Sequence, residues 1–377
     1  MSPTHGRPIR TGYVYDRRFL LHDTGVDQFS LPTGQLMDPE PHPSSLRIVR
    51  RTAQLIENSG LLNDLVDLSP KVAGTDDLAL VHDEGYIRHV RELTDRGGGR
   101  LDRSTPVVAG TWDAALVAVG AAISLVDDVL DGAIRNGFGL LRPPGHHAGI
   151  DRGRGFCVFN NAAIAVRHAR RRRDVGRVAV IDWDVHHGDG IQEAFWDEPD
   201  VLFVSLHQDN WFPAGSGGVD EVGGAGAEGR TVNVPLPPGT GDRGYELAFA
   251  ELVAPIVRAF APELIVVCAG QDASMMDPLG RMIVTMDGFR TLATAARDLA
   301  DETCDGGLVV LNEGGYSPGY APFCTLAIVE ALVGVRTEVD DPLAGGSELA
   351  QAMVELRAEQ ERAIARARTV QAEHWDL

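Results

Sequence analysis

Two pairs of adjacent histidines, the second of them flanked by three aspartates, are the residues best suited to do chemistry in this chain. The first pair, His146 and His147, closes the segment RPPGHH (142–147). The second pair lies in the segment DWDVHHGD (182–189). Imidazoles and carboxylates serve in proteins as general acids and bases and as ligands of divalent metals. These segments therefore indicate acid–base or metal-assisted chemistry.

The spacing of Asp184 and His186 suits two ligands of one metal ion. Alternate residues of a strand share a face and lie about 6–7 Å apart. A metal at about 2.0–2.2 Å from each donor fits between them where the strand ends and curls. A catalytic zinc ion usually takes three protein ligands and one water, and Asp277, at another expected strand end, is the natural third. An isolated D-x-H pair is more often an ordinary hydrogen-bonded loop, so the convergence of several ionisable groups carries this interpretation.

The elements that must position these groups are short apolar runs alternating with segments of helical periodicity. This alternation predicts an α/β fold with a central, mostly parallel sheet and helices on both faces. Ligands of such sheets bind beyond the carboxyl ends of the strands, which is where the polar segments lie. The predicted strands are Phe138–Leu141, Val178–Ile181, Val201–Leu206, Leu264–Cys268 and Leu308–Leu311, and the predicted helices are Thr111–Leu130, Asn160–Arg173, Tyr245–Phe260, Met286–Asp301 and Phe323–Val333.

Length and composition favour one large domain over residues 1–377. No change of composition marks an internal linker, and no repeat is visible. The final segment, about 348–373, reads as an amphipathic helix that docks on the body or meets a partner chain.

The acidic composition restricts the possible partners. The formal net charge is -20, with 54 acidic and 34 basic residues. Such a surface repels nucleic acids and anionic lipids and tolerates cationic substrates such as basic peptides or polyamines. The four cysteines form no C-x-x-C pair, the N-terminus carries no apolar signal core, and no run approaches the length of a membrane helix. We expect a soluble, cytoplasmic protein that binds neither nucleic acid nor membrane.

The motifs taken together resemble the histone deacetylase superfamily, and most of all its bacterial class II members, the deacetylase-like amidohydrolases. The resemblance implies the arginase/deacetylase fold, a single three-layer domain, and zinc-dependent deacylation. It is most specific over residues 142–318. The matching segments are RPPGHHAG (142–149), GFCVFNNAAIA (155–165), VAVIDWDVHHGDGIQEAFW (178–196), VSLHQ (204–208), NVPLPPGTG (233–241), DASMMDPLGRM (272–282) and EGGYSP (313–318).

The resemblance assigns roles to the metal ligands and to the histidines. It implies zinc ligation by Asp184, His186 and Asp277. His147 would be the main general base and then the acid for the leaving amine, while His146 would act mainly through its charge. Asp182 and Asp189 would hydrogen-bond the second ring nitrogens of His146 and His147, respectively. Many class II relatives carry Asn at the position of Asp189, and the aspartate here should make His147 more basic.

The resemblance also implies an oxyanion donor and a substrate channel. Tyr316 would donate its hydroxyl to the oxyanion of the tetrahedral intermediate. Phe156 and Phe212 would line a narrow tunnel that suits a linear alkyl chain ending in an acylated nitrogen. Gly155, through its carbonyl, and Gly314 complete the expected substrate-binding residues.

Three further expectations come from the resemblance. A structural potassium ion would bind largely to backbone oxygens of the segments that hold Asp182, Asp184, His186, Ser205 and Leu206. Arg47 would line an internal channel behind the site. Gln271 stands where relatives usually have Phe, which puts the substrate preference in doubt more than zinc binding.

Several alternatives remain open at the level of sequence. The substrate is an acyl-lysine side chain or, alternatively, an acetylpolyamine or another small amide. An arginase-like ureohydrolase would hold two manganese ions with an Asp-x-His-x-Asp stretch, but Gly188 replaces the second aspartate. A non-catalytic binder of acylated amines is disfavoured by Tyr316 and the histidine pairs. The resemblance also implies a homo-oligomer, a dimer or tetramer.

Overall fold

A parallel sheet forms the centre of the molecule. The computed structural model describes residues 10–27, 38–343 and 357–377. Within these ranges eight strands pair in the order β10-β9-β8-β11-β12-β7-β1-β4, and every neighbouring pair is parallel. The strands are β1 (Thr11–Val14), β4 (Leu65–Asp67), β7 (Asn136–Gly139), β8 (Val178–Asp182), β9 (Val201–Gln208), β10 (Thr231–Leu236), β11 (Leu264–Ala269) and β12 (Leu308–Asn312).

The five strands expected from the sequence are confirmed, with boundaries shifted by two residues or fewer. The sequence did not predict β1, β4 or β10. Strands β4 and β10 lie at the two edges of the sheet. Pro235 and Asn233 within β10 weaken its strand pattern, and Pro is tolerated there because an edge strand has a free side. Two antiparallel pairs stand apart from the sheet, β2 (Val26–Asp27) with β3 (Glu40–Pro41) and β5 (Gly98–Arg100) with β6 (Pro106–Val108).

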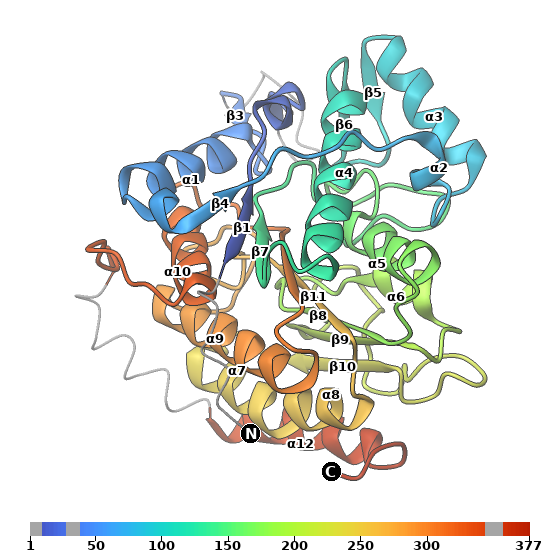
Figure 1. Ribbon diagram of the computed structural model, residues 1–377, viewed down its shortest axis with the longest axis vertical. Coiled ribbons are helices and arrows are strands. Elements are labelled where there is room, and N and C mark those ends of the chain that lie inside the picture. The colour runs from blue at the N-terminus through green and yellow to red at the C-terminus, as the bar shows by residue number, and fades with distance from the viewer. Residues whose placement is uncertain (1–9, 28–37, 344–356) are drawn as a thin grey trace.

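Helices cover both faces of the sheet (Figure 1). The predicted helix Tyr245–Phe260 is interrupted by a π turn at Phe249–Val253, which separates α7 from α8. The helices are α1 (Leu46–Asn58), α2 (Thr75–Leu78), α3 (Glu84–Asp95), α4 (Thr111–Leu130), α5 (Asn161–Arg172), α6 (Asp189–Phe195), α7 (Asp242–Ala248), α8 (Ala254–Phe260), α9 (Met286–Thr303), α10 (Ala321–Val333) and α12 (Arg357–Gln371), with 3-10 turns at Arg17–Leu21 and Leu61–Asp64.

The strand β11 shows how the two layers of core arise. Successive strand side chains point to opposite faces. Ile265 and Val267 belong to the core cluster that contains residues of α1, α7, α8, α9 and α10. Val266 and Cys268 belong to the cluster that contains residues of α4, α5 and α6. The run LIVVCA is apolar throughout because both of its faces are covered, as in other buried parallel sheets.

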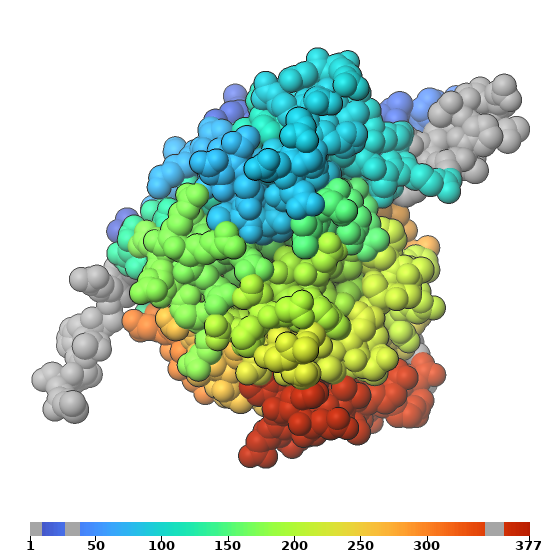
Figure 2. Space-filling model, turned by 90° about the vertical axis from the view of Figure 1, so that its right-hand side faces the viewer, coloured from blue at the N-terminus to red at the C-terminus, as the bar shows by residue number. Residues whose placement is uncertain are grey.

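The C-terminal helix α12 lies against the edge strand β10. Ala363, Ile364 and Ala367 are buried, and Gln371 Nε2 donates to the Thr231 carbonyl at 3.0 Å. The red C-terminal segment forms one end of the molecule (Figure 2). The helix was expected from about residue 348, but residues 348–356 lie outside the described residues. Among the described residues, no helix combines the length and apolar character needed to cross a membrane.

Candidate active site

The segment after β8 places its side chains by tight turns rather than by strand alternation. The strand ends at Asp182. Asp182 Oδ1 accepts the N–H of Asp184 at 3.0 Å, and Asp184 Oδ1 accepts the N–H of His186 at 2.9 Å. Each carboxylate thus closes a turn two residues ahead, a pattern typical of aspartate. The alternation argued from the sequence reaches only as far as Asp182, yet the turns bring Asp184 and His186 together.

The structure gathers Asp184, His186 and Asp272 into one buried group whose potential ligand atoms all lie within 4.8 Å of one another. His186 Nδ1 lies 3.0 Å from Asp184 Oδ1 and 3.1 Å from Asp272 Oδ2. Asp272 was not assigned a role from the sequence. Its position three residues after β11, at the same sheet edge as Asp184, was the available signal.

Asp277, the expected third ligand, lies next to this group and is not one of its three members. Its carboxylate accepts the N–H of Tyr316 at 2.6 Å and that of Leu279 at 2.8 Å. Burial, followed by the charge of Asp272, raises the pKa of Asp277 to about 8. In the described part of the chain, no Lys or Arg pairs with Asp184, Asp272 or Asp277. Asp184 and Asp272 instead face the His186 ring, so the group offers a cation two carboxylates and an imidazole as ligands.

The two histidines of the first pair stand side by side, each held by its own carboxylate. His146 Nδ1 lies 3.0 Å from Asp182 Oδ2, and His147 Nδ1 lies 2.7 Å from Asp189 Oδ1. The ring centroids are 3.9 Å apart. These are the two pairings that the resemblance implied. In each ring the Nδ1 contact leaves Nε2 as the nitrogen available for chemistry.

The two imidazoles differ in electrostatic environment. Burial alone would lower the pKa of His146, but the carboxylates of Asp184 and Asp182 outweigh it and raise this pKa well above its usual value. Burial and the neighbouring His146 lower the pKa of His147 well below its usual value. Groups whose environments push their pKa values apart are suited to different roles. His146 is arranged to be cationic and His147 to be neutral.

The residues after β12 join the loops that follow β7, β8 and β11 to one another. The Gly314 N–H donates to Asp184 Oδ2 at 2.8 Å, and the Tyr316 N–H donates to Asp277 Oδ2. Glu313 Oε2 accepts the N–H groups of Gly145 and His146. In the sequence, Glu313 opens the matching segment EGGYSP (313–318), and no function was expected of it. Its adjacency to Gly314 and Tyr316 was the signal that it belongs to the site.

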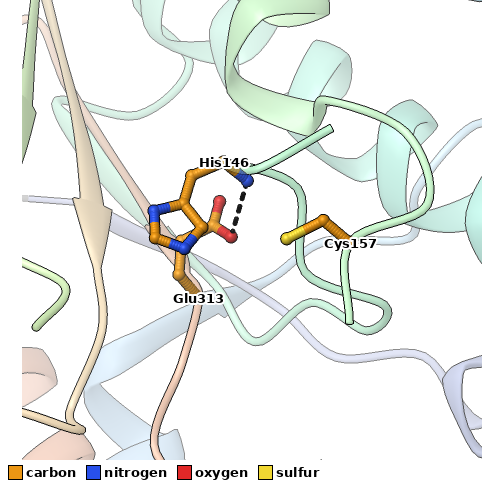
Figure 3. Close-up of side chains that lie close together, drawn as sticks. All are labelled: His146, Cys157 and Glu313. Carbon is orange, nitrogen blue, oxygen red and sulfur yellow. Dashed lines mark hydrogen bonds between the residues drawn. The ribbon is translucent and has the colours of Figure 1, made fainter. Parts of the chain in front are cut away.

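Figure 3 shows a second buried group, His146, Cys157 and Glu313, whose potential ligand atoms also lie within 4.8 Å of one another. Burial raises the pKa of Cys157 well above its usual value and that of Glu313 to about 7. The Cys157 sulfur lies 3.4 Å from the N–H of His147. A thiol held protonated in this way supports the loop and is not suited to act as a nucleophile.

A pocket of ≈ 390 Å³ leads to His147, His186 and Tyr316. Phe156 packs edge-on against Tyr316, with ring centroids 5.3 Å apart, and Phe212 packs against His147 at 4.9 Å. Phe156 and Phe212, which were expected to line a tunnel, thus lie in the wall of this pocket. The wall is completed by Ser104, Gly155, Trp211, Pro278, Leu279 and Arg281, of which only Gly155 was expected.

Gly155 has a conformational reason to be glycine. Its φ is 55°, and a Cβ there would overlap Cδ2 of His147 and come within 2.9 Å of the Phe212 ring. No other residue fits between the base candidate and the aromatic wall without displacing one of them.

Other expected residues lie away from the pocket. Asp182 and Ser205 are register partners on β8 and β9, with Leu206 next along the buried strand. Arg47 is exposed on α1, so the expectation that it lines an internal channel is wrong. A buried guanidinium lies instead at Arg142, which donates to the carbonyls of His22 and Ser44. Gln271 is 1% exposed and donates to the Ala269 carbonyl, away from the pocket.

The second histidine pair is divided between two roles. His186 faces the pocket, whereas His187 turns away, with Nδ1 2.9 Å from Ser216 Oγ and Nε2 3.0 Å from Gln192 Oε1. Both nitrogens of His187 are engaged by neutral side chains, which makes it a structural residue of the loop.

Comparisons with known proteins agree with this geometry. The histone deacetylase domain model matches residues 42–332. The chain is 42% identical over 345 residues to a histone deacetylase-like amidohydrolase of Pseudomonas aeruginosa, covering 91% of each chain. It is 38% identical over 327 residues to a probable deacetylase of Archaeoglobus fulgidus, covering 86% of each. The crystal structure of the HDA15 HD domain superposes with a TM-score of 0.84 at 31% identity, covering 97% of this chain and 96% of that one. The chain belongs to the histone deacetylase family, with the arginase/deacetylase fold of that family.

Proposed function

We propose that the protein is a zinc-dependent amidohydrolase that removes acetyl or other acyl groups from the amine of acyl-lysine side chains or similar alkyl amides. One observation carries the proposal. Two histidines, each held by its own aspartate, stand beside Tyr316 and a buried Asp–His–Asp group at the floor of an aromatic-walled pocket.

The donor set suits one zinc ion. Carboxylate oxygen and imidazole nitrogen are ordinary zinc ligands, and three of them leave a fourth position open in a catalytic site. Asp184 and His186 supply two ligands. We assign Asp277 as the third because it is 8% exposed and precedes Pro278 and Leu279 of the pocket wall, whereas Asp272 is fully buried. Asp272, whose Oδ2 lies 3.1 Å from Nδ1 of His186, would then hold the position of that ring. When bound, the ion would polarise the amide carbonyl and acidify the attacking water.

The chain's own residues supply the proton transfers. His147 keeps its Nδ1 hydrogen toward Asp189, so Nε2 can take a proton from water and return it to the leaving amine. Its lowered pKa keeps it neutral and ready to accept that proton. His146, whose raised pKa favours the imidazolium, stabilises the negative charge that develops on the carbonyl oxygen.

Tyr316 is suited to donate the last hydrogen bond. Burial, reinforced by the charges of Asp272 and Asp184, raises its pKa well above the usual value. The hydroxyl therefore stays protonated at any working pH and can donate to the oxyanion. One such donor is worth about 3–4 kcal/mol in the transition state.

The ureohydrolase alternative lacks support at position 188. A second metal would need a further carboxylate there, but a Cβ at Gly188 would overlap Asp182 Oδ2 and come within 3.2 Å of the Phe203 ring. Because ligand number distinguishes one-metal from two-metal sites, the surroundings of Gly188 favour a single ion.

The pocket wall favours an acyl-lysine over an acylpolyamine. A polyamine carries ammonium groups a few carbons beyond the amide, and these need a carboxylate or an open aqueous path. The described residues that line the pocket include no Asp or Glu, and Arg281 lies among them. In an acyl-lysine, the neutral peptide groups of the substrate backbone would lie where a polyamine places its ammonium groups. The polyamine stays the alternative substrate because one human relative is named polyamine deacetylase HDAC10. That relative is 36% identical over 358 residues, which cover 90% of this chain and 51% of the relative's own length.

A structural potassium ion remains part of the proposal. It would bind near Asp182 and Ser205, which face each other across β8 and β9, together with backbone oxygens near Asp184, His186 and Leu206. A buried carboxylate beside a strand end is a setting in which a monovalent cation offsets charge.

The proposal is tested by combining metal analysis with turnover. The purified protein should contain one zinc per chain and release acetate from a fluorogenic acetyl-lysine amide. Binding of the amide without release would favour the non-catalytic binder. Two metal ions per chain with urea formed from a guanidino substrate would favour the ureohydrolase.

A further inference from the structure

Asp189 is engaged on both of its oxygens. Oδ1 faces His147 Nδ1 at 2.7 Å, and Oδ2 pairs with Arg154 Nη2. The Asp189 side chain is 6% exposed and the Arg154 side chain 29%. Arg154 Nε is buried without a hydrogen-bond partner among the described residues, and the ion pair with Asp189 holds the guanidinium through Nη2.

The position of Asp189 at the start of α6 suggests a helix cap, but the hydrogen bonds assign it another task. The N–H groups of Gly190 and Ile191 both donate to the His146 carbonyl, and that of Gln192 donates to the Gly188 carbonyl. The first-turn donors of α6 are therefore satisfied by backbone oxygens. The Asp189 carboxylate is free to serve His147 and Arg154 alone.

Arg154 comes from a tight turn that also builds the pocket wall. The N–H of Cys157 closes the turn on the Arg154 carbonyl at 2.9 Å, and the N–H of Phe156 donates to Thr105 Oγ1 at 2.9 Å. Gly155 and Phe156 both have positive φ, 55° and 71°. The same turn thus presents the wall of the pocket on one side and the Arg154 side chain to Asp189 on the other.

We propose that Arg154 is a positioning residue for the deacylation: by holding Asp189 Oδ2, it fixes Oδ1 on Nδ1 of His147 and keeps the His147 ring in one tautomer and one orientation. The inference rests on the proposed function, in which His147 is the base. A carboxylate held at one oxygen only can rotate about its Cβ–Cγ bond, whereas a carboxylate held at both cannot. The guanidinium acts through Asp189 and touches neither the substrate nor the reacting atoms.

Arg154→Met tests the inference. We expect kcat for an acetyl-lysine amide to fall about fivefold or more, with KM changed less than about twofold. Direct partners of a functional histidine are typically worth about 10–100-fold, and Arg154 acts one contact further away. Arg154→Lys should recover most of kcat. In an Asp189→Asn background, Arg154→Met should have almost no further effect, since the contact through which it acts is already altered.

A matched control lies two residues away. Arg152 belongs to the same loop and pairs with Glu193, but it does not contact Asp189 through a hydrogen bond or ion pair. Arg152→Met removes the same charge and should leave kcat within about twofold of the wild type. Equal kcat in Arg154→Met and Arg152→Met would overturn the inference. A double variant of Arg154→Met and Asp189→Asn whose loss of kcat equals the product of the two single losses would also overturn it.

A readout independent of turnover separates this inference from the proposed function. In zinc-loaded protein labelled with ¹⁵N-histidine, the ring nitrogen shifts of His147, assigned by comparison with His147→Gln, report which nitrogen carries the proton. The wild type should show the Nδ1–H tautomer and Arg154→Met a mixture. A wild-type protein that is inactive on every acyl amine would contradict the proposed function only. An unchanged His147 tautomer in Arg154→Met would contradict this inference only.

Discussion

The carboxylate of Glu313 accepts the backbone N–H of His146 at 3.1 Å and also that of the preceding Gly145 at 2.7 Å. Glu313 stands at the end of β12, three residues before Tyr316, so this contact joins the loop of the histidine pair to the loop of the tyrosine. One buried side chain thus contributes to the relative position of these two groups.

Glu313→Ala should therefore damage both stability and catalysis. It leaves two buried N–H groups without an acceptor, and each such group costs about 1–3 kcal/mol. We expect the free energy of unfolding in urea to fall by about 2–6 kcal/mol and kcat to fall with it. Glu313→Gln, which keeps one acceptor oxygen, should lose much less of both. A stable and fully active Glu313→Ala would show that the two loops hold their positions independently.

The stability of the wild type relative to Glu313→Gln should depend on pH. Burial raises the pKa of Glu313 from 4.5 to about 7. Below pH 4.5 the group is protonated in both the folded and unfolded states and contributes no difference. As pH rises toward 7, Glu313 loses its proton in the unfolded state before it does so in the folded state, and this ionisation stabilises the unfolded state. The unfolding free energy of the wild type should thus fall relative to Glu313→Gln, by at most about 3 kcal/mol at 1.36 kcal/mol per pKa unit. Urea titrations of both proteins between pH 4.5 and 8 measure this difference, and parallel curves would refute it.

Substitutions at the acidic group should identify the metal ligands. Asp184→Ala and His186→Ala should lose zinc and activity together. Asp277→Asn should lower zinc content strongly if Asp277 is the third ligand, while Asp272→Asn, acting on the orientation of His186, should lower zinc affinity about 10–100-fold and leave a site that fills at high zinc. Metal analysis after dialysis against graded zinc concentrations separates the two. A stronger loss of zinc in Asp272→Asn than in Asp277→Asn would make Asp272 the third ligand.

Tyr316→Phe should retain zinc but lose about 10²-fold or more in kcat, the scale of one oxyanion donor. The phenyl ring keeps the edge contact with Phe156, so folding should be unchanged. Single-turnover kinetics with the acetyl-lysine amide, beside zinc analysis, measure the effect. Normal turnover would exclude Tyr316 as the donor.

Arg281 should disfavour cationic substrates. It lines the pocket and stacks on Trp211, with its guanidinium carbon 5.3 Å from the ring centroid. Arg281→Glu should raise kcat/KM for acetylspermidine relative to a neutral acetyl-lysine amide by about fivefold or more, because charge interactions near the surface amount to about 1 kcal/mol or more. Arg243→Glu makes the same charge change on α7 at a residue that does not line the pocket, and is the control. An equal change in both variants would mean that only the net charge matters.

The parts of the fold that were predictable from the sequence are those whose pattern is local. The runs VAVID and LIVVCA are apolar throughout because both faces of a central parallel strand are buried, and each ends in residues that turn the chain. Strand β10 escaped prediction because its pairing with β9, rather than its own composition, makes it a strand. The break between α7 and α8 is a π turn, which leaves no periodic signal of its own.

The sequence by itself determined which chemical groups are present, in what order, and that they follow buried strands. Only the tertiary structure decided which atoms face one another. Parallel pairing sets β8 beside β11 and β11 beside β12, so that Asp184, Asp272 and the N–H of Gly314 lie close together although they are far apart along the chain. Contacts such as Asp189 with Arg154, or Asp272 with His186, depend on the course of loops and on rotamers selected by packing. Such contacts arise from distances between strand ends, which no local pattern of residues encodes.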